Sequence, residues 1–331
     1  MARSQMGEVR VAVIQAGSLI MDKDGCVEKA LSLAAQAGEQ GARIMLFPEA
    51  FVPGYPRGLG FGTVVGSRSD AGREDFARYW ENSVVVPGPE TRALGEAARK
   101  AGAYLACGVI EKDAEGGTLY CTIVYFGPAG EYLGKHRKLK PTAAERLIWG
   151  EGDGSTLFTT ATPHGRLGGL VCWENYMPLA RAAMYAKGVS IYIAPTADAR
   201  DSWQATIRHI ALEGRCFVLA CNQFVTKDMY PDDLACRDDL AGAPEVMCNG
   251  GSAIVDPLGR YISGPEWGRE SILIADLDTS MVPKSRFDFD VMGHYARPDV
   301  FELIVNEEPR SSVRKRAPGV SEASHVDIPG R

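Results

Sequence analysis

Cys172 is the side chain in this sequence that is best placed to act as a nucleophile. It follows the apolar run of residues 167–171, which predicts a strand, and it precedes a helix that is expected to begin near Pro178. A thiol in such a turn faces the positive end of the helix dipole, so its pKa is expected to lie below the usual value. The position alone also fits an ordinary buried cysteine, and it favours that alternative. Four other cysteines lie in strand patterns and are expected to belong to the core: Cys107, Cys121, Cys216 and Cys221.

Glu49 is the corresponding candidate for a general base. It stands between two apolar runs, residues 44–48 and 50–53, so a lone carboxylate is expected at the end of a buried strand. Burial raises the pKa of a carboxyl group, and a pKa closer to neutrality suits a group that takes a proton from a thiol. A carboxylate that only caps a turn is the alternative.

Lys138 and Glu145 supply charges that could complete such a site. Lys138 lies in the basic run of residues 135–140, which is typical of a solvated edge strand. Strand alternation would turn only some of these side chains inward, and composition does not choose among them. Glu145 follows in a segment where the simpler interpretation is an acidic residue in the first turn of a helix.

A cysteine assisted by a histidine is the rival arrangement. His209 lies among apolar residues of a predicted helix, and His164 lies in a turn. No sequence feature links either residue to Cys172, so we expect both histidines to be satisfied or exposed.

The elements that must position these residues alternate between strands and helices. Apolar runs rich in β-branched residues indicate strands, and helical spacing between them indicates helices. In the first half, the pattern predicts strands at residues 9–15, 43–47 and 104–110, and helices at 27–41 and 91–102. A hairpin follows, with strands at 119–126 and 131–136 around a turn at 127–130.

The second half repeats this order. It predicts strands at residues 167–172, 189–194 and 217–222, helices at 178–187 and 202–215, and a closing hairpin of 252–255 and 260–263. Two halves that each join βα units to a hairpin predict one α/β domain, with two mixed sheets covered by helices. We assign residues 1–306 to this domain and expect residues 307–331, rich in charge, Ser and Pro, to form a mobile tail.

The composition is that of an ordinary globular protein. Of the 331 residues, 45% are hydrophobic and 24% are charged, which provides for a sizeable core. The formal net charge is -6 and the basic residues are scattered, which argues against nucleic acid as a partner. No secretory signal and no apolar run of roughly 20 residues is present, so a cytoplasmic protein without membrane contact is expected. The eight cysteines include no Cys-x-x-Cys pair, so we expect free thiols and no metal site.

Three short segments resemble the signature segments of the nitrilase superfamily, the carbon-nitrogen hydrolases with a Glu-Lys-Cys triad. In the family's order, they are Phe47-Pro48-Glu49, Arg137-Lys138-Leu139 and Cys172-Trp173-Glu174-Asn175. The resemblance covers about residues 9–305 and implies a four-layer αββα sandwich of two mixed sheets flanked by helices. Cys-Trp-Glu, Pro56 and residues 293–299 look like the nitrilase branch, and residues 172–181 and 194–198 are closest to plant-type and related bacterial nitrilases. Many other nitrilases carry His at the position of Asn175.

This resemblance implies that the chain hydrolyses an organic nitrile to a carboxylic acid and ammonia, through a thioimidate and a thioester on Cys172. Glu49 would carry protons and activate water. Lys138, with the backbone N–H of Trp173, would stabilise charge that develops on the substrate. Glu145 would hydrogen-bond Lys138 and position the substrate. No metal and no organic cofactor is implied.

Other outcomes of the same triad stay open. Release of the amide, as in cyanide hydratases, and hydrolysis of an amide substrate would both use these residues. A catalytically silent interaction protein on the same fold is the alternative outside enzymes. Loss of a triad residue would indicate it, and all three residues are present.

Bulky side chains near the three segments are expected to wall the substrate pocket. We assign this role to Tyr55, Trp149, Trp173 and Tyr176 and to the segment 195–197, which comprises Pro195, Thr196 and Ala197. The aromatic residues among them could instead belong to the core, and for Trp149 the two interpretations are close.

The resemblance also implies a homo-oligomer, either a dimer or a larger spiral assembly. Residues 227–247 form a long acidic, Pro-containing insertion ahead of a turn expected at residues 248–252. This insertion and the segment that continues from Cys172 would contribute to subunit contacts. The predicted helix at 178–187 supports a dimer, because a face of small residues could pack on a symmetry mate: Leu179, Ala182, Ala183 and Ala186. The alternative is that this face packs on its own sheet and that the insertion is a solvated loop.

Overall fold

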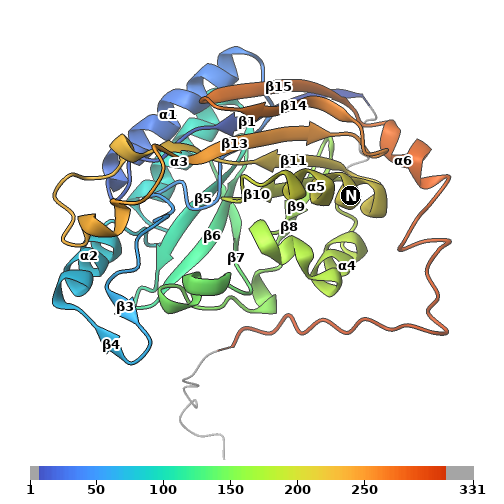
Figure 1. The fold of residues 1–331 in the computed structure, drawn as a ribbon. Helices are drawn as coiled ribbons and strands as arrows, with labels where there is room; N and C mark the ends of the chain where they lie inside the picture. The colour runs from blue at the N-terminus through green and yellow to red at the C-terminus, as the bar shows by residue number, and fades with distance from the viewer. Residues whose placement is uncertain (1–6, 311–331) are drawn as a thin grey trace, which may run out of the picture.

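The computed structural model describes residues 7–310, which build two large mixed sheets with helices on their outer faces (Figure 1). The first sheet has the strand order β15-β1-β2-β5-β6-β7. Its strands are β1 (Glu8–Gln15), β2 (Ile44–Leu46), β5 (Tyr104–Lys112), β6 (Leu119–Phe126), β7 (Tyr132–Arg137) and β15 (Ser271–Asp278). β1, β2 and β5 are parallel, and β15, β6 and β7 join them through antiparallel pairs.

The second sheet has the order β12-β13-β11-β10-β9-β8, with β14 also paired to β13. Its strands are β8 (Thr159–Thr162), β9 (Gly165–Gly169), β10 (Ile191–Pro195), β11 (Phe217–Cys221), β12 (Phe224–Thr226), β13 (Val246–Val255) and β14 (Tyr261–Trp267). A small hairpin of β3 (Thr63–Val64) and β4 (Ser67–Arg68) lies apart from both sheets. The helices are α1 (Lys23–Glu39), α2 (Asp70–Glu81), α3 (Pro89–Ala101), α4 (Pro178–Ala186), α5 (Asp201–Gly214) and α6 (Met281–Arg286).

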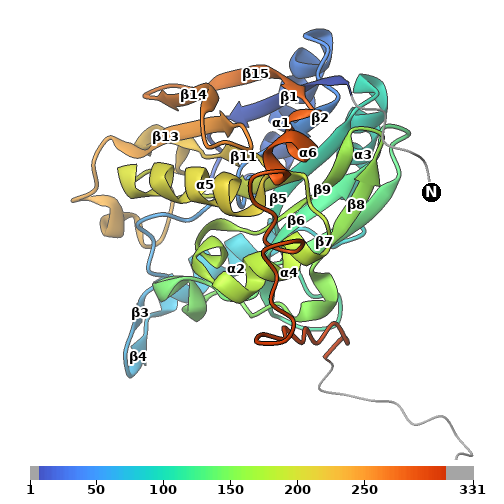
Figure 2. The ribbon, with the colours of Figure 1, turned by 90° about the vertical axis from the view of Figure 1, so that its right-hand side faces the viewer.

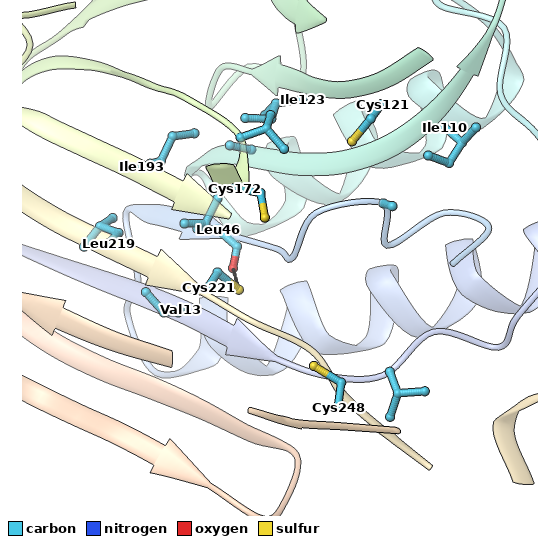
Figure 3. Packing of buried hydrophobic residues seen from close by; sticks show 14 of the residues in the cluster. Val13, Leu46, Ile110, Cys121, Ile123, Cys172, Ile193, Leu219, Cys221 and Cys248 are labelled. Atoms are coloured by element: carbon cyan, nitrogen blue, oxygen red, sulfur yellow. Dashed lines mark hydrogen bonds between the residues drawn. The ribbon is translucent and has the colours of Figure 1, made fainter. Parts of the chain in front are cut away.

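The inner faces of the two sheets pack against each other. Val13 on β1 and Leu46 on β2 belong to one buried cluster with Ile193 on β10 and Leu219 on β11 (Figure 3). Side chains on a strand alternate between its two faces, so the intervening residues of these strands point outward instead. The layer between the sheets is therefore an apolar core, and the site residues stand at its edge.

The outer faces of both sheets are covered by helices (Figures 1 and 2). Apolar residues of α1 and α3 pack on the first sheet, where Ala12 and Ile14 alternate with the inward residues of β1. Apolar residues of α4 and α5 pack on Tyr192 and Ala194 of β10 in the second sheet. The expected four-layer αββα sandwich of two mixed sheets is thus confirmed.

Several elements differ from the sequence pattern. Helix α2 and the strands β8, β12 and β15 were not expected; the segments of α2, β8 and β12 are short or polar, whereas β15 is an eight-residue apolar segment that was overlooked. The turn expected at residues 248–252 is wrong, since these residues lie inside β13. Gly250 and Gly251 have positive φ angles there, and a Cβ atom on Gly251 would lie only 2.5 Å from the ring of Trp267. The glycines therefore do not mark a turn. They lie on a bulged strand, where the absence of a Cβ atom leaves room for neighbouring side chains.

The insertion at residues 227–247 is anchored to the body of the protein. The buried carboxylate of Asp75 on α2 accepts hydrogen bonds from the backbone N–H groups of Ala235 and Cys236. Leu234 and Leu240 are buried in the core cluster between the sheets. The segment is thus anchored at these points, while its other residues from 231 to 246 are exposed or partly exposed, so the alternative of a solvated loop stays open.

After α6 the chain continues to residue 310 without a helix or strand (Figures 1 and 2). Glu307 pairs with Lys187, and the backbone N–H of Arg310 donates to Asp153. The remainder of the predicted tail, residues 311–331, lies outside the described residues. Within residues 7–310, no helix has the length and apolar character that crossing a membrane requires.

Candidate active site

Cys172 stands in a tight turn directly beyond the second sheet. Strand β9 ends at Gly169, three residues earlier than the sequence predicts, and Cys172 itself begins a short 3-10 helix, Cys172–Tyr176. Its φ angle is +50°, a left-handed conformation that costs free energy for a residue with a Cβ atom. The amide of Asn175 donates to the carbonyl oxygens of Leu170 and Cys172, at 3.0 and 2.8 Å, and so stabilises this turn from below. Asn175 is fully buried. It stands where many other nitrilases carry His, and in this chain its side chain stabilises the turn.

The prediction of a lowered pKa for Cys172 is wrong. Burial raises the pKa of the thiol, the charge of Glu49 raises it further, and Lys138 and Thr196 act in the opposite direction. Helix α4 begins at Pro178, as expected, but the effect of its dipole is confined to its first turn and is outweighed by burial at Cys172. Cys172 is thus a protonated thiol in the resting site, and a base must take its proton before it can attack.

Thr196 contacts the sulfur atom directly. Its hydroxyl oxygen accepts the backbone N–H of Asp198 at 3.0 Å, and the hydroxyl donates to Sγ of Cys172 at 3.1 Å. This donor favours the thiolate form of Cys172.

Glu49 is fully buried at the end of the short strand β2. The backbone of its segment lies against β5, where a Cβ atom on Gly108 would lie 2.7 Å from Cα of Glu49. The side chain of Gln223 donates to the Glu49 carbonyl oxygen at 2.8 Å. Burial raises the pKa of Glu49, as expected, while the ammonium group of Lys138 and the thiol of Cys172 lower it.

Strand alternation selects Lys138 from the basic run. Lys135 and Arg137 turn to one side and pair with the buried carboxylate of Glu111. His136 and Lys138 turn to the other side and are buried. Lys140 is exposed and pairs with Glu151 at the surface. The inward ammonium group is therefore the one at position 138.

Lys138 bridges two carboxylates. Its Nζ lies 2.7 Å from Oε1 of Glu49 and 2.7 Å from Oε2 of Glu145. Burial alone would lower the pKa of this ammonium group, but the acidic groups around it, Glu49 foremost, raise it well above its usual value. Lys138 therefore stays charged.

Glu145 has its oxygens occupied by fixed donors. Its Oε1 accepts the hydroxyl of Tyr55 at 2.6 Å, and its Oε2 accepts the backbone N–H of Thr142 at 2.6 Å besides Lys138. It lies in a 3-10 helix, Ala143–Leu147, so the expected position in a first helical turn is correct. With these partners, Glu145 holds the ammonium group in place.

The two carboxylates thus differ in what they can do. Oε1 of Glu49 is bound by Lys138 and faces the thiol of Cys121 at 3.5 Å, whereas its buried Oε2 has no hydrogen-bond partner among the described residues. A buried carboxylate oxygen without a partner, on a group with a raised pKa, can accept and return a proton. Glu49 has that free oxygen, and Glu145 is held by donors on both of its oxygens.

A cavity of about 190 Å³ opens beside the sulfur. Three of the predicted pocket residues, Tyr55, Trp173 and Ala197, line it, and so does Glu145. The other polar residues of this wall were not assigned to the pocket from the sequence: Arg57, Thr142, Asp198 and Arg200. Each lies within four residues of a predicted site residue, so closeness to those residues was the local signal that could have identified them.

The remaining predicted pocket residues are placed differently. Trp149 is 4% exposed, packs edge-on against the Tyr55 ring, and lines a second cavity of about 300 Å³ beyond Tyr55. Pro195 ends β10 and is buried, and Tyr176 is 42% exposed and bonded to Thr206. Neither Pro195 nor Tyr176 is among the residues that line the cavity at Cys172.

Comparison with known proteins assigns the chain to a family. Residues 10–287 match the Carbon-nitrogen hydrolase family. An aliphatic nitrilase of Sinorhizobium fredii is 54% identical over 313 residues, which are 94% of this chain and 100% of that protein. A bifunctional nitrilase/nitrile hydratase of Lupinus angustifolius is 50% identical over 309 residues, which are 92% of this chain and 88% of that protein.

Solved structures agree with the fold. Nit3 of Saccharomyces cerevisiae, a member of branch 10 of the nitrilase superfamily, superposes with a TM-score of 0.68 at 20% identity. The superposition covers 89% of this chain and 98% of Nit3. The chain therefore belongs to the carbon-nitrogen hydrolase family.

Proposed function

We propose that this chain is a nitrilase, which hydrolyses an organic nitrile to a carboxylic acid and ammonia. The observation that carries the proposal is the unequal state of the two carboxylates at Lys138. Glu49 keeps one oxygen free for proton transfer, while Glu145 is held by Tyr55, Thr142 and Lys138. A nitrile needs a thiol nucleophile and a carrier that brings protons to its nitrogen, and this arrangement supplies both.

The steps balance with two molecules of water. Glu49 takes the proton of Cys172, the sulfur bonds to the nitrile carbon, and the proton is delivered to the nitrogen to give a thioimidate. One water adds to this carbon, and ammonia leaves after a further proton transfer through Glu49, which gives a thioester. A second water breaks the carbon–sulfur bond, releases the acid and restores the thiol. Lys138 stabilises the negative charge that develops during each addition, together with the backbone N–H of Trp173.

The relatives support this choice of substrate class. Proteins named as nitrilases share about half of their residues with this chain over nearly its whole length. One relative is named a bifunctional nitrilase/nitrile hydratase, so release of the amide stays open as the alternative for this chain. Acid and amide differ in whether nitrogen or sulfur leaves the tetrahedral intermediate, and we propose that the acid dominates because Glu49 can protonate the nitrogen.

The test is to incubate the purified protein with aliphatic, arylacetic and amino-acid-derived nitriles and to quantify ammonia, acid and amide separately. We expect ammonia and acid in equal amounts from at least one nitrile. Cys172→Ala should abolish ammonia release and keep the fold, whereas Cys216→Ala, a buried cysteine of the outer core, should remain active. Turnover by Cys172→Ala comparable to the unaltered protein would refute the mechanism, and amide as the main product would favour the alternative.

We also propose that the chain assembles into a dimer or a larger spiral. The outward side of α4 supports a dimer, because Leu179 is 69% exposed and Ala186 is exposed as well. Ala183 was expected on the same face, but it is buried in the chain's own core. The contact surface on α4 is therefore narrower than the sequence predicts.

Light scattering tests the assembly. We expect at least a dimer for the unaltered protein and a smaller mass for Leu179→Arg. Val64→Arg, at an equally exposed apolar residue on the β3–β4 hairpin, is the matched control and should keep the original mass. Asp238→Lys, on the exposed surface of the insertion, should reduce the larger forms to dimers. A monomeric unaltered protein contradicts the whole assembly proposal, and unchanged masses contradict the parts assigned to α4 and the insertion.

A cytoplasmic location completes the proposal. All eight cysteines are free and seven of them are buried, which suits a reducing compartment. Cell fractionation with an antibody to the protein should find it with cytosolic markers, and recovery with membranes would contradict this location.

A further inference from the structure

Glu174 is a buried carboxylate that the mechanism above does not use. It is 1% exposed and follows Cys172 by two residues. Its Oε1 accepts the backbone N–H of Leu139 at 2.6 Å, and its Oε2 accepts the backbone N–H of Val171 at 2.7 Å. Leu139 is the residue after Lys138, and Val171 is the residue before Cys172. One carboxylate thus binds the backbone next to two members of the triad.

A buried histidine completes this arrangement. Nε2 of His136 lies 3.2 and 3.0 Å from the two oxygens of Glu174, and its Nδ1 lies 2.8 Å from the carbonyl oxygen of Thr156. The carbonyl oxygen can only accept, so Nδ1 carries a hydrogen. The two backbone N–H groups that donate to Glu174 favour its carboxylate form, which accepts a hydrogen bond from Nε2. Burial alone would lower the pKa of His136, but the charge and hydrogen bonds of Glu174 raise it above its usual value.

These contacts join the two sheets of the sandwich. His136 lies on β7 in the first sheet, and Leu139 follows that strand. Val171 and Cys172 follow β9 in the second sheet. Elsewhere the sheets meet through apolar side chains, which do not fix direction, and through polar bonds such as that from the backbone N–H of Ser252 on β13 to Gln15 on β1. Charge-assisted hydrogen bonds are directional and short, so they can fix the distance between the two segments.

We propose that Glu174 is a positioning residue, whose carboxylate sets the separation between the Lys138 ammonium group and the Cys172 sulfur. His136 acts as its buried counter-ion. The proposal rests on the proposed function, since it concerns the same nucleophile and the same charge. A local role, in which Glu174 only closes the turn at Cys172, would explain its bond to Val171. It would not explain the bonds to Leu139 and His136, which come from the other sheet.

The substitution Glu174→Gln tests this assignment. The amide keeps the size of the side chain, but its NH₂ group cannot accept, so one of the two backbone N–H groups loses its partner. Glu111→Gln is the matched control, because Glu111 is a buried carboxylate that binds Lys135 and Arg137 of the same strand β7. Glu111 lies on β5, so its bonds remain within the first sheet.

Three quantities should be measured for both variants: the free energy of unfolding, kcat and KM on a nitrile that the unaltered protein hydrolyses, and the rate at which iodoacetamide alkylates Cys172. Peptide mass spectrometry assigns the alkylated cysteine. We expect both variants to lose stability. Only Glu174→Gln should lower kcat, by about 100-fold with KM within about threefold, as for a misplaced reacting group. Alkylation of Cys172 should slow by about fivefold or more in this variant alone, because the thiolate is less well stabilised.

Equal losses of kcat in Glu174→Gln and Glu111→Gln would overturn the proposal, because they would show a general effect of stability. If Glu174→Gln does not fold, Glu174→Asp decides, since it keeps the charge for His136 but is too short to reach both backbone N–H groups. Wild-type kcat and alkylation in Glu174→Asp would overturn the proposal, and a selective loss of both would support it. If no nitrile is hydrolysed by the unaltered protein, the proposed function fails, and the alkylation rates still decide the role of Glu174.

Discussion

Replacing Lys138 by methionine would leave two buried carboxylates facing each other without a cation. Methionine is similar in length to lysine, so the change removes the charge and little volume. In the native site, Glu49 and Glu145 each lie 2.7 Å from the ammonium nitrogen. Removing one partner of a buried ion pair costs about 3–5 kcal/mol, a large part of the roughly 5–15 kcal/mol by which domains are stable. Turnover should fall by at least about 100-fold, the effect of losing one donor that stabilises developing charge.

The cost of this substitution should depend on pH. The pKa of Glu49 is already raised by burial and is lowered by Lys138, so loss of Lys138 raises it further. A carboxyl group with a raised pKa holds a proton in the folded state that the unfolded chain gives up. Its contribution to stability is complete below the unfolded pKa and is lost as the pH rises toward the folded pKa, by up to about 1.4 kcal/mol per pH unit. The deficit of Lys138→Met relative to the unaltered protein should therefore widen from pH 6 to pH 8.5, the range of the assay.

Urea unfolding across this range, with activity measured at each pH, tests the reasoning. Lys140→Met is the control, because Lys140 is exposed and pairs with Glu151 at the surface. A surface pair is worth about 1 kcal/mol at most, so the control should keep its activity and show no widening deficit. If the loss in free energy of unfolding of Lys138→Met stays constant with pH, the carboxylates do not take up a proton and the reasoning is refuted. Loss of activity in the control but not in Lys138→Met would show that the wrong lysine was assigned.

The other substitutions address the partners of the triad. Thr196→Val removes the hydroxyl that donates to Cys172 at 3.1 Å, so kcat/KM should fall by about tenfold and its rise with pH should move to higher pH; an unchanged pH profile would contradict this role. Tyr55→Phe removes the donor to Glu145 at 2.6 Å and should lower the free energy of unfolding in urea by about 1.5–3 kcal/mol at pH 7, whereas a loss no greater than that of an exposed Tyr→Phe change would contradict it. Gly108→Ala should destabilise the fold by about 1–3 kcal/mol and reduce turnover, because its Cβ would collide with the backbone that carries Glu49; wild-type thermal stability would show that the segment can yield.

The layers could be predicted from the sequence because buried residues recur with the period of the strand or helix that carries them. The alternation of inward Val13 with outward Ile14 on β1, and the helical stripes between strands, both follow from packing on one side. The same reasoning could not choose Lys138 from the basic run. Strand alternation divides the cations between two faces, but it does not show which face is buried. In the structure, Lys138 lies between Glu49 and Glu145, and Lys135 and Arg137 lie on the opposite side of β7.

The electrostatics of Cys172 could not be predicted from neighbouring residues. The sequence suggested a helix dipole and a lowered pKa, but the dominant effect is burial between the sheets, where Cys172 lies with Cys121 and Leu46 (Figure 3). The polar wall of the adjacent cavity was missed although its residues lie close in sequence to predicted site residues. Periodicity shows which faces of strands and helices are buried, but it does not show which loop side chains face a cavity.

The geometry of the Cys172 turn shows the same limit most clearly. A left-handed cysteine would be assigned to no regular element from its sequence, and the apolar run before it suggested a longer strand. The conformation persists because hydrogen bonds from several parts of the chain stabilise it. Asn175 donates to the carbonyl oxygen of Cys172, and His136 binds Glu174, which accepts the backbone N–H of Val171. Asn175 is in turn fixed by the hydroxyl of Tyr192 on β10, which donates to it at 2.8 Å. The strain at the nucleophile is thus balanced by contacts that both sheets supply, so loosening either sheet should affect Cys172 before it affects the core.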